Sequence, residues 1–310
     1  MLKQHTTTSS PPNGIYVGLE VLQQLRYLSR QCSSSKHLLS RASLGGQHRS
    51  RAISRGMEFE EVRQYQPGDD IRTIDWRVTA RTQVTHTKRY SEEKEKPIIT
   101  AVDQRKSLFF GSQSCFKSVY ACHLAALINW ATLDQGDRCG GLVLSSQGIQ
   151  ETRPVRSHKT VNRWLQQLSQ ANQQLSLDVE KEPPLSTLLQ QLSKTLQAGA
   201  HIFIISDFYD LDKACEQWLF QLARHHRVDM LWVYDPLESQ LPAGGQLTIS
   251  QTYCENEHLQ LHVDPVLQQQ FHNAFLQKER YLQNISQQLK LRLHKASLDT
   301  LPVDILHRAL

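Results

Sequence analysis

Three aspartates lie close together early in the chain and could act as a group. Asp69, Asp70 and Asp75 fall within one short stretch. Grouped carboxylates bind hard metal ions and serve as general acids and bases, so one hypothesis is a metal-dependent hydrolase. No nucleophile–base pair accompanies them, which favours the alternative that they form ion pairs with neighbouring arginines. Those arginines are Arg63, Arg72, Arg77 and Arg81.

Two further aspartates each follow a short apolar run. Asp103 comes after residues 98–102, and Asp207 comes directly after residues 201–206. Apolar runs of this length are typical of buried strands in a parallel sheet. In open α/β sheets, ligands bind at the carboxyl ends of the strands. We therefore expect both aspartates to lie at the carboxyl edge of such a sheet.

The elements that must position these aspartates alternate between strands and helices. The predicted strands cover residues 98–102, 139–144, 149–155, 201–206, 228–234 and 290–294. Apolar residues at helical spacing predict helices over 116–131, 161–168, 185–197, 212–224, 264–289 and the C-terminal residues. The strand after Gly148 is expected to form a hairpin with the strand before it. This alternation predicts an α/β fold with a doubly wound, mostly parallel sheet.

The N-terminal part of the chain has a different pattern. Residues 1–14 have no apolar core and are expected to be a disordered leader rather than a signal peptide. A helix is predicted over 15–30, followed by short strands and turns. Gln66-Pro67-Gly68-Asp69 predicts a tight turn, because proline fixes φ and glycine accepts a positive φ. We therefore divide the chain into a leader (1–14), a small N-terminal module (15–96) and an α/β domain (97–310).

Composition excludes several classes of protein. The net charge is only +5, and no apolar run approaches the roughly 18 residues that span a bilayer. These features predict a cytoplasmic protein without a transmembrane segment. A second alternative function is binding of nucleic acid or another anionic polymer through clustered arginines. We disfavour it, because the basic residues form no long stripe; they are Arg41, Arg49, Arg51 and Arg55.

Motifs of common enzyme families are missing from the sequence. It contains no nucleotide-binding glycine fingerprint, no phosphate-binding loop and no G-x-S-x-G motif. His225, His226 and Asp229 adjoin a helix-to-strand junction, and we interpret them as surface residues because a further ligand at suitable spacing is missing. The sequence therefore predicts a protein without enzymatic activity.

Residues 54–93 carry a dense and balanced mixture of charges with apolar residues between them. Their order and spacing closely resemble the signature of the domain-of-unknown-function-58 family. The matching residues include Glu58, Phe59, Arg63, Tyr65, Pro67, Gly68, Asp69, Asp70, Arg72, Asp75, Trp76 and Arg81. We expect this stretch to be ordered and docked, with Phe59, Tyr65 and Trp76 buried, because solvated charge runs lack such aromatics.

The resemblance implies a von Willebrand factor A-like domain with a divalent cation site after its first strand. Of the aspartate and two hydroxyls that such a motif supplies there, Asp103 and Ser107 match, but Arg105 replaces the first serine. The threonine of a later loop has no aligned counterpart near Pro183-Pro184, whereas Asp207 matches the last ligand. The sequence therefore predicts a degenerate ion site at Asp103, Arg105, Ser107 and Asp207.

Three interpretations of this degenerate site remain open. In the favoured one, Arg105 takes the electrostatic place of the ion, because arginine cannot bind a cation and stays charged. Alternatively, Arg105 turns outward and a weakened Mg²⁺ site survives, or the two aspartates merely cap the segments that follow. We expect no cofactor, and we expect Arg105 or Lys106 to lie near Asp103 or Asp207.

The resemblance also implies a partner. Members of the family work with MoxR-type AAA+ ATPases, so we expect a non-enzymatic adaptor. Such an adaptor would present the carboxyl edge of its sheet and the signature stretch to the ATPase and to a client protein. The function would then be protein remodelling or complex assembly. No residue of the sequence identifies the client.

Overall fold

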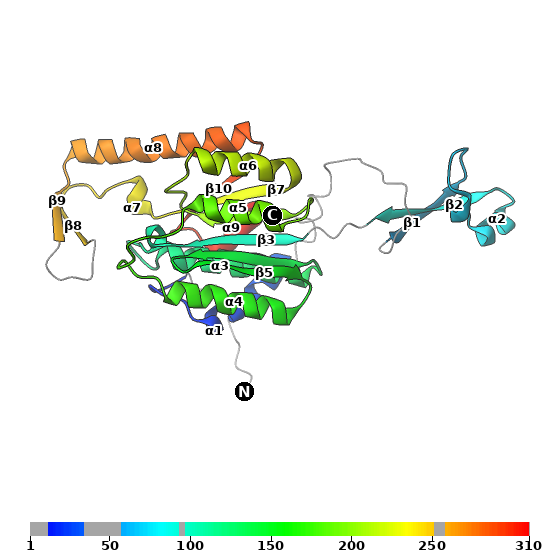
Figure 1. The fold of residues 1–310 in the computed structure, drawn as a ribbon, viewed down its shortest axis with the longest axis horizontal. Coiled ribbons are helices and arrows are strands. Elements are labelled where there is room, and N and C mark those ends of the chain that lie inside the picture. Colours follow the sequence, from blue (N-terminus) through cyan, green and yellow to red (C-terminus); the bar gives the residue numbers. More distant parts are fainter. Residues whose placement is uncertain (1–11, 34–56, 93–96, 251–257, 310) are drawn as a thin grey trace. The chain divides into compact units, whose positions relative to one another are not determined.

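The computed structural model describes residues 12–33, 57–92, 97–250 and 258–309. It divides the chain into two compact units. The large unit contains residues 1–43 and 96–310, and the small unit contains residues 44–95. We describe each unit by itself, and Figure 1 labels the elements of both.

The large unit is built on a six-stranded sheet in the order β10-β7-β6-β3-β4-β5. Its strands are β3 (Ile98–Gln104), β4 (Cys139–Ser145), β5 (Gly148–Val155), β6 (His201–Ser206), β7 (Arg227–Tyr234) and β10 (Arg292–Ser297). All neighbours are parallel except β4 and β5, which form the expected antiparallel hairpin. The predicted α/β class with a mostly parallel sheet is therefore confirmed.

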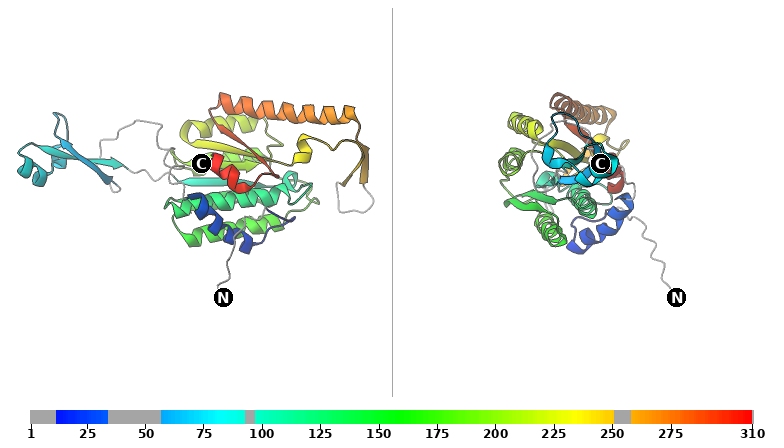
Figure 2. Two further views of the ribbon diagram at one scale, coloured as in Figure 1. Left: turned by 180° about the vertical axis from the view of Figure 1, so that it is seen from behind. Right: turned by 90° about the vertical axis from the view of Figure 1, so that its right-hand side faces the viewer.

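Helices cover both faces of this sheet (Figure 2). One face packs against α3 (Lys117–Asp134), α4 (His158–Gln173) and α9 (Pro302–Ala309), and α1 (Leu19–Ser33) packs on these helices rather than on the strands. The opposite face packs against α5 (Leu185–Thr195), α6 (Lys213–His225) and α8 (Pro265–Gln288). Helix α3 is buried from Lys117 to Leu133 because sheet and helices enclose it on all sides. Among the described helices, none is long and apolar enough to cross a membrane.

The N-terminal helix corrects the expected domain division. Helix α1 was assigned to a module of residues 15–96, but Leu22 and Leu25 are buried in the core of the large unit. The indole nitrogen of Trp130 donates to the carbonyl of Leu22 at 2.9 Å, which fixes α1 against α3. The apolar face of α1 is thus satisfied by the α/β domain.

Between β7 and β10 the chain makes a detour that the sequence did not predict. It forms the short helix α7 (Pro236–Ser239) and the antiparallel pair β8 (Gln246–Ser250) and β9 (His258–His262). Helix α8 then returns along the sheet to β10. Asp264 caps α8 by accepting from the backbone N–H of Leu267 at 2.7 Å, as the Asp264-Pro265 pair suggests.

The small unit pairs β1 (Met57–Gln64) with β2 (His86–Glu92) in an antiparallel ladder. The 3₁₀ turn η2 (Ile71–Thr73) and helix α2 (Trp76–Thr82) lie between these strands. Gly68 has the positive φ of 108° that the predicted turn requires, and the N–H of Asp69 donates to the carbonyl of Gln66 at 3.0 Å. The sequence predicted strands and turns here but missed the helix.

Candidate functional site

The sheet changes its direction of winding between β3 and β6, because β4 follows on one side of β3 and β6 lies on the other. The carboxyl ends of these two strands therefore leave a crevice, the usual place for ligands in such a sheet. Asp103 lies at the end of β3, and Asp207 follows the last residue of β6. Both predicted aspartates thus lie at the switch point of the sheet.

Arg105 pairs with Asp103 inside the protein. Its Nε donates to Oδ1 at 2.9 Å and its Nη2 donates to Oδ2 at 2.8 Å. The backbone N–H of Arg105 and the hydroxyl of Ser206 also donate to this carboxylate, at 3.1 and 2.8 Å. Burial raises the pKa of Asp103, and the guanidinium opposes that shift. Four donors converge on Asp103, which stabilises its charged form.

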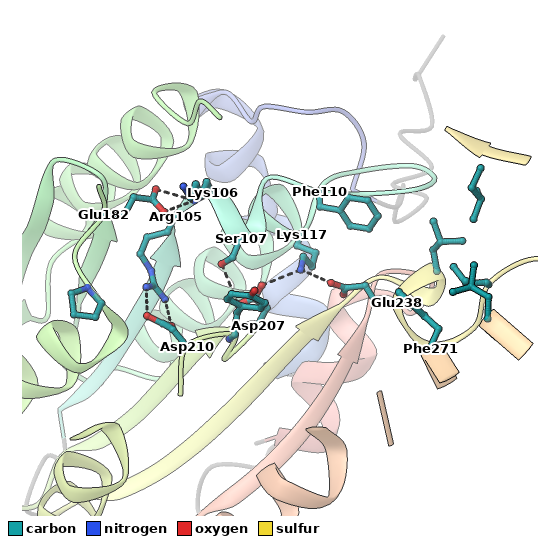
Figure 3. A pocket seen from close by; sticks show the side chains of 16 residues that line it. Arg105, Lys106, Ser107, Phe110, Lys117, Glu182, Asp207, Asp210, Glu238 and Phe271 are labelled. Atoms are coloured by element: carbon teal, nitrogen blue, oxygen red, sulfur yellow. Dashed lines mark hydrogen bonds and ion pairs between the residues drawn. The ribbon is translucent and has the colours of Figure 1, made fainter. Parts of the chain in front are cut away.

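The other side of the same guanidinium binds Asp210. Arg105 Nη1 lies 2.6 Å from Oδ2 and Nη2 lies 2.8 Å from Oδ1, a bidentate pair. The carbonyl of Pro183 also accepts from Nη1 at 3.3 Å. Burial raises the pKa of Asp210, but hydrogen bonds from Arg105 and from the backbone of Leu185 lower it overall. Arg105 therefore lies between two carboxylates, and Figure 3 shows its pairing with Asp210.

The backbone adopts a left-handed conformation at Phe208, two positions before Asp210. Phe208 has a φ of 51°, which is uncommon for a bulky side chain and costs about 1–2 kcal/mol. The Ser206 hydroxyl accepts from the N–H of Phe208, and the Asp207 carboxylate accepts from the N–H of Tyr209. The Phe208 ring is buried in the core, which offsets the strain.

Asp207 has a different cation, Lys117, which the sequence did not reveal. Lys117 Nζ donates to Asp207 Oδ2 at 3.0 Å and to Glu238 Oε1 at 2.8 Å. Ser107 donates its hydroxyl to Asp207 Oδ1 at 3.2 Å. Burial lowers the pKa of Lys117, but the two carboxylates raise it overall. Lys117, the first residue of α3, is therefore kept in its charged form.

The structure brings together part of the predicted group. Arg105 joins Asp103, whereas Ser107 joins Asp207. Lys106 does not pair with either aspartate. Its backbone N–H donates to Glu182, and its Nζ donates to the carbonyl of Val179 at 3.3 Å. One signal could have identified Lys117, since a lysine in the first turn of an apolar helix opposes the helix dipole and needs a nearby anion. Asp210 carries no comparable signal.

These charged residues form one side of a cavity of about 790 Å³ (Figure 3). The charged side chains that line it are Arg105, Lys106, Lys117, Glu182, Asp207, Asp210 and Glu238. Ser107 also lines the cavity, and apolar and aromatic side chains form the rest of the lining; they are Phe110, Pro184, Tyr209, Leu237, Leu241, Leu247, Leu267 and Phe271. The cavity therefore joins the switch point of the sheet to the detour between β7 and β10.

The aspartates of the small unit serve local structure. Asp69 accepts from Arg63 at 2.7 Å and from the N–H of Gln66. Asp70 accepts from the N–H of Arg72, as the cap of η2. Asp75 caps α2, and the hydrogen bond from the backbone of Val78 lowers its pKa most. These roles leave the hydrolase hypothesis without support.

The described residues also contain no group of three or more His, Cys, Asp and Glu arranged to hold a metal ion. Within residues 57–92 the expected ion pairing is correct only for Arg63, with Asp69. Asp75 instead pairs with Lys88 at 3.4 Å. The side chains of Arg72, Arg77 and Arg81 are exposed and make no ion pair with the three aspartates.

Within the small unit, Trp76 is not buried: the residue is 67% exposed, and Ile71 is 66% exposed. Tyr65 is half-buried. The side chains of Glu58 and Phe59 lie outside the described residues, as do the arginines proposed for anionic polymers at positions 41, 49, 51 and 55.

Asp229 also differs from its expected surface position. It is fully buried at the amino end of β7, where His201 and His294 lie 2.5 and 2.8 Å from its oxygens. Burial raises its pKa, but the two histidines and Arg227 lower it well below its usual range. This buried cluster lies at the opposite edge of the sheet from Asp103.

The chain is similar to proteins of known sequence over most of its length. An uncharacterized protein of Mycobacterium tuberculosis and one of Mycobacterium bovis are each 30% identical over 237 residues, which cover 74% of this chain and 71% of theirs.

Solved structures show lower similarity. The SpRpn10 VWA domain is 11% identical with a TM-score of 0.36, covering 68% of this chain and 93% of that one. An aerotolerance-related membrane protein from Bacteroides fragilis is 14% identical with a TM-score of 0.34, covering 57% and 87%. We therefore base the fold on the strand order of the chain itself.

One protein family accounts for the sequence as a whole. The family described as "Protein of unknown function DUF58" matches residues 61–281. That range includes most of the signature stretch of the small unit and every residue of the buried charge network at the switch point. The chain therefore belongs to the DUF58 family.

Proposed function

We propose that this chain is a non-enzymatic protein-interaction adaptor that works with a MoxR-type AAA+ ATPase in protein remodelling or complex assembly. The observation that carries the proposal is the network at the switch point. There Arg105 and Lys117 are each held between two carboxylates beside an open cavity. A site whose charges are already paired within the chain is suited to recognition rather than to chemistry.

The residues that line the cavity support this choice. Acyl or phosphoryl transfer by a side-chain nucleophile needs a hydroxyl or thiol beside a general base. Ser107 donates its hydroxyl to Asp207, but that carboxylate is already paired with Lys117, and the described lining includes neither histidine nor cysteine. The cavity has exposed aromatic groups instead, since Tyr209 is 79% exposed. Exposed aromatics beside polar groups are common where proteins bind one another.

Binding of the ATPase provides the direct test. The purified chain would be titrated with a MoxR-type ATPase from the same organism in the presence of a slowly hydrolysed ATP analogue, with binding followed by interferometry. We expect saturable binding that Tyr209→Ala weakens about tenfold, as for a contact residue at an interface. Phe220→Ala is the matched control, because Phe220 is exposed on α6 away from the cavity.

Two results would contradict the proposal. Failure of the ATPase to bind with saturation would remove the assigned partner. Equal effects of Tyr209→Ala and Phe220→Ala would show that the carboxyl edge is not the surface it contacts. Melting curves of both variants would establish that they remain folded.

We also propose that the switch point works without a divalent cation. Arg105 donates to both oxygens of Asp103, so a metal there would have to displace a buried bidentate cation. Calorimetric titration with Mg²⁺ and Mn²⁺ should show no saturable binding tighter than about millimolar, the weak end of protein sites. Saturable binding that Asp103→Ala abolishes would establish a metal site instead.

A further inference from the structure

We propose that the cavity at the carboxyl edge binds a basic side chain, arginine or lysine, of a partner peptide, with an apolar residue of the same peptide beside it. The inference rests on the proposed function and specifies the chemistry of the partner segment. It is carried by the way charge, exposure and apolar surface are distributed around the cavity.

The charge count at the switch point favours a cation. Arg105 lies between Asp103 and Asp210, and Lys117 lies between Asp207 and Glu238. Each group holds one positive and two negative charges, so each carries a net charge of about −1.

Two more charges at the rim cancel each other. Lys106 and Glu182 line the cavity and lie side by side, joined through the Lys106 backbone. Lys278 lies outside the lining, with its Nζ 5.9 Å from the rings of Tyr209 and Trp232. Counting Lys278 still leaves the region negative.

The carboxylates of these two groups are more exposed to the cavity than the cations are, which strengthens the negative charge that a ligand meets. The two cations are hidden, with side-chain exposures of 7% for Arg105 and 2% for Lys117. The outer carboxylates are open to the cavity, at 31% for Asp210 and 33% for Glu238. A ligand that enters therefore meets carboxylate oxygens before it meets the cations. A basic group is attracted there, whereas an acidic group would be repelled.

The apolar part of the lining suits the rest of such a residue. Phe110 and Phe271 lie toward the Glu238 end of the cavity in Figure 3, and each is more than a third exposed. Arginine and lysine carry long apolar stems, and arginine also stacks on aromatic rings. Several leucines from α7, β8 and α8 extend this surface.

The size of the cavity indicates a peptide segment rather than a single ion. About 790 Å³ is within the range of pockets that enclose drug-sized ligands, so there is room for more than one side chain. A basic residue would reach Asp210 or Glu238, and a neighbouring apolar residue would lie on Phe110 or Phe271. This combination defines the peptide that we expect.

Three labelled peptides test the proposal. Acetylated and amidated decapeptides in a Gly/Ser frame would carry Leu-Arg-Leu, Leu-citrulline-Leu or Leu-Glu-Leu at their centre. Binding would be measured by fluorescence anisotropy at low salt. We expect the arginine peptide to bind at least about tenfold more tightly than the citrulline peptide, because a hydrogen bond to a charged group is worth that factor. The glutamate peptide should bind least.

Variants of the chain locate the binding. Glu238→Gln keeps an oxygen that can accept from Lys117 and should reduce the preference for arginine over citrulline severalfold. Phe271→Ala should weaken all three peptides. The matched controls are Glu20→Gln and Phe220→Ala, which remove the same groups from exposed positions on α1 and α6. Melting curves would confirm that each variant is folded.

The outcomes separate this inference from the proposed function. Equal binding of the arginine and citrulline peptides, or tightest binding of the glutamate peptide, would overturn it. So would a free polyamine such as spermidine binding more tightly than the arginine peptide. If the ATPase binds and the arginine peptide does not, the inference alone fails. If the arginine peptide binds and the ATPase does not, only the assigned ATPase is wrong.

Discussion

The switch point of the large unit and the small unit contain the same kinds of residue and use them in opposite ways. At the switch point, Arg105 and Lys117 are buried, and each binds two carboxylates. In the small unit, the aspartates accept from backbone N–H groups at turns and caps. Several arginines and Trp76 are left exposed there. A balanced charge composition therefore does not show whether the charges satisfy one another or remain available to a partner.

Removal of Arg105 should have the largest effect. Arg105→Met leaves Asp103 buried without its cation, and breaking a buried ion pair in this way typically costs about 3–5 kcal/mol in the free energy of unfolding. Arg77→Met in the small unit removes an exposed arginine and should change it by less than about 0.5 kcal/mol. Urea unfolding followed by circular dichroism measures both, and hydrogen exchange identifies the unit that opens.

A double variant serves as the control for Arg105. Asp103→Asn combined with Arg105→Met removes both charges, so it should be more stable than Arg105→Met alone. A loss below about 1 kcal/mol in the single variant would mean that water or another cation replaces the guanidinium. The ion pairs of Arg105 would then stabilise the large unit much less than their short distances suggest, and the switch point would differ little from the small unit.

Lowering the pH should weaken the large unit through His123. Burial in α3 lowers the pKa of His123 to about 4, from an ordinary value of 6.5. Below pH 6.5 the unfolded chain takes up this proton and the folded chain does not. The free energy of unfolding should therefore fall between pH 6.5 and pH 4, by up to about 3 kcal/mol.

The slope of the free energy of unfolding against pH, rather than its absolute value, tests this prediction. Burial also lowers the pKa of His201, which adds to the same trend. The difference between wild type and His123→Gln isolates the contribution of His123. Urea midpoints collected from pH 7 to pH 4 should fall less steeply for His123→Gln, and parallel slopes would contradict the assigned cause.

Trp76→Ala should have the smallest effect. Trp76 is 67% exposed within the small unit and contributes little to the folding of that unit, so we expect a change below about 0.5 kcal/mol. The matched control is Trp164→Ala, which empties a fully buried position in the large unit and should cost about 3–5 kcal/mol. A thermal melt of each variant provides the comparison. Comparable losses would show that Trp76 is covered in the folded protein.

The sequence predicted the sheet well because strand and helix patterns are local. Apolar runs located β3, β6 and β7 closely, and Asp103 and Asp207 were placed correctly at strand ends. The hairpin β8–β9 was missed although both strands alternate polar and apolar residues, because each strand is only five residues long. Local patterns therefore defined the positions of the elements much better than their contacts.

Partners of charged residues could not be predicted in the same way. The pairing of Arg105 with Asp103 follows from their closeness in the chain, but Asp210 is 105 positions from Arg105 and follows a left-handed residue, Phe208, that no local pattern predicts. Trp76 was misassigned because an aromatic residue near charges fits a buried or an exposed position equally well. Which one occurs depends on tertiary contacts that no short pattern encodes.

The bridge between Arg105 and Asp210 has a consequence for the order of folding. It joins residues 105 positions apart, so it closes a long loop and depends on prior pairing of β3 with β6. Contacts of this kind form late, after most of the entropic cost of loop closure has been met. We expect the bridge to slow unfolding and to have little effect on the folding rate, because it is absent from the transition state. Stopped-flow kinetics of Arg105→Met should then show the change in the unfolding arm, so the site would control how long the domain stays folded.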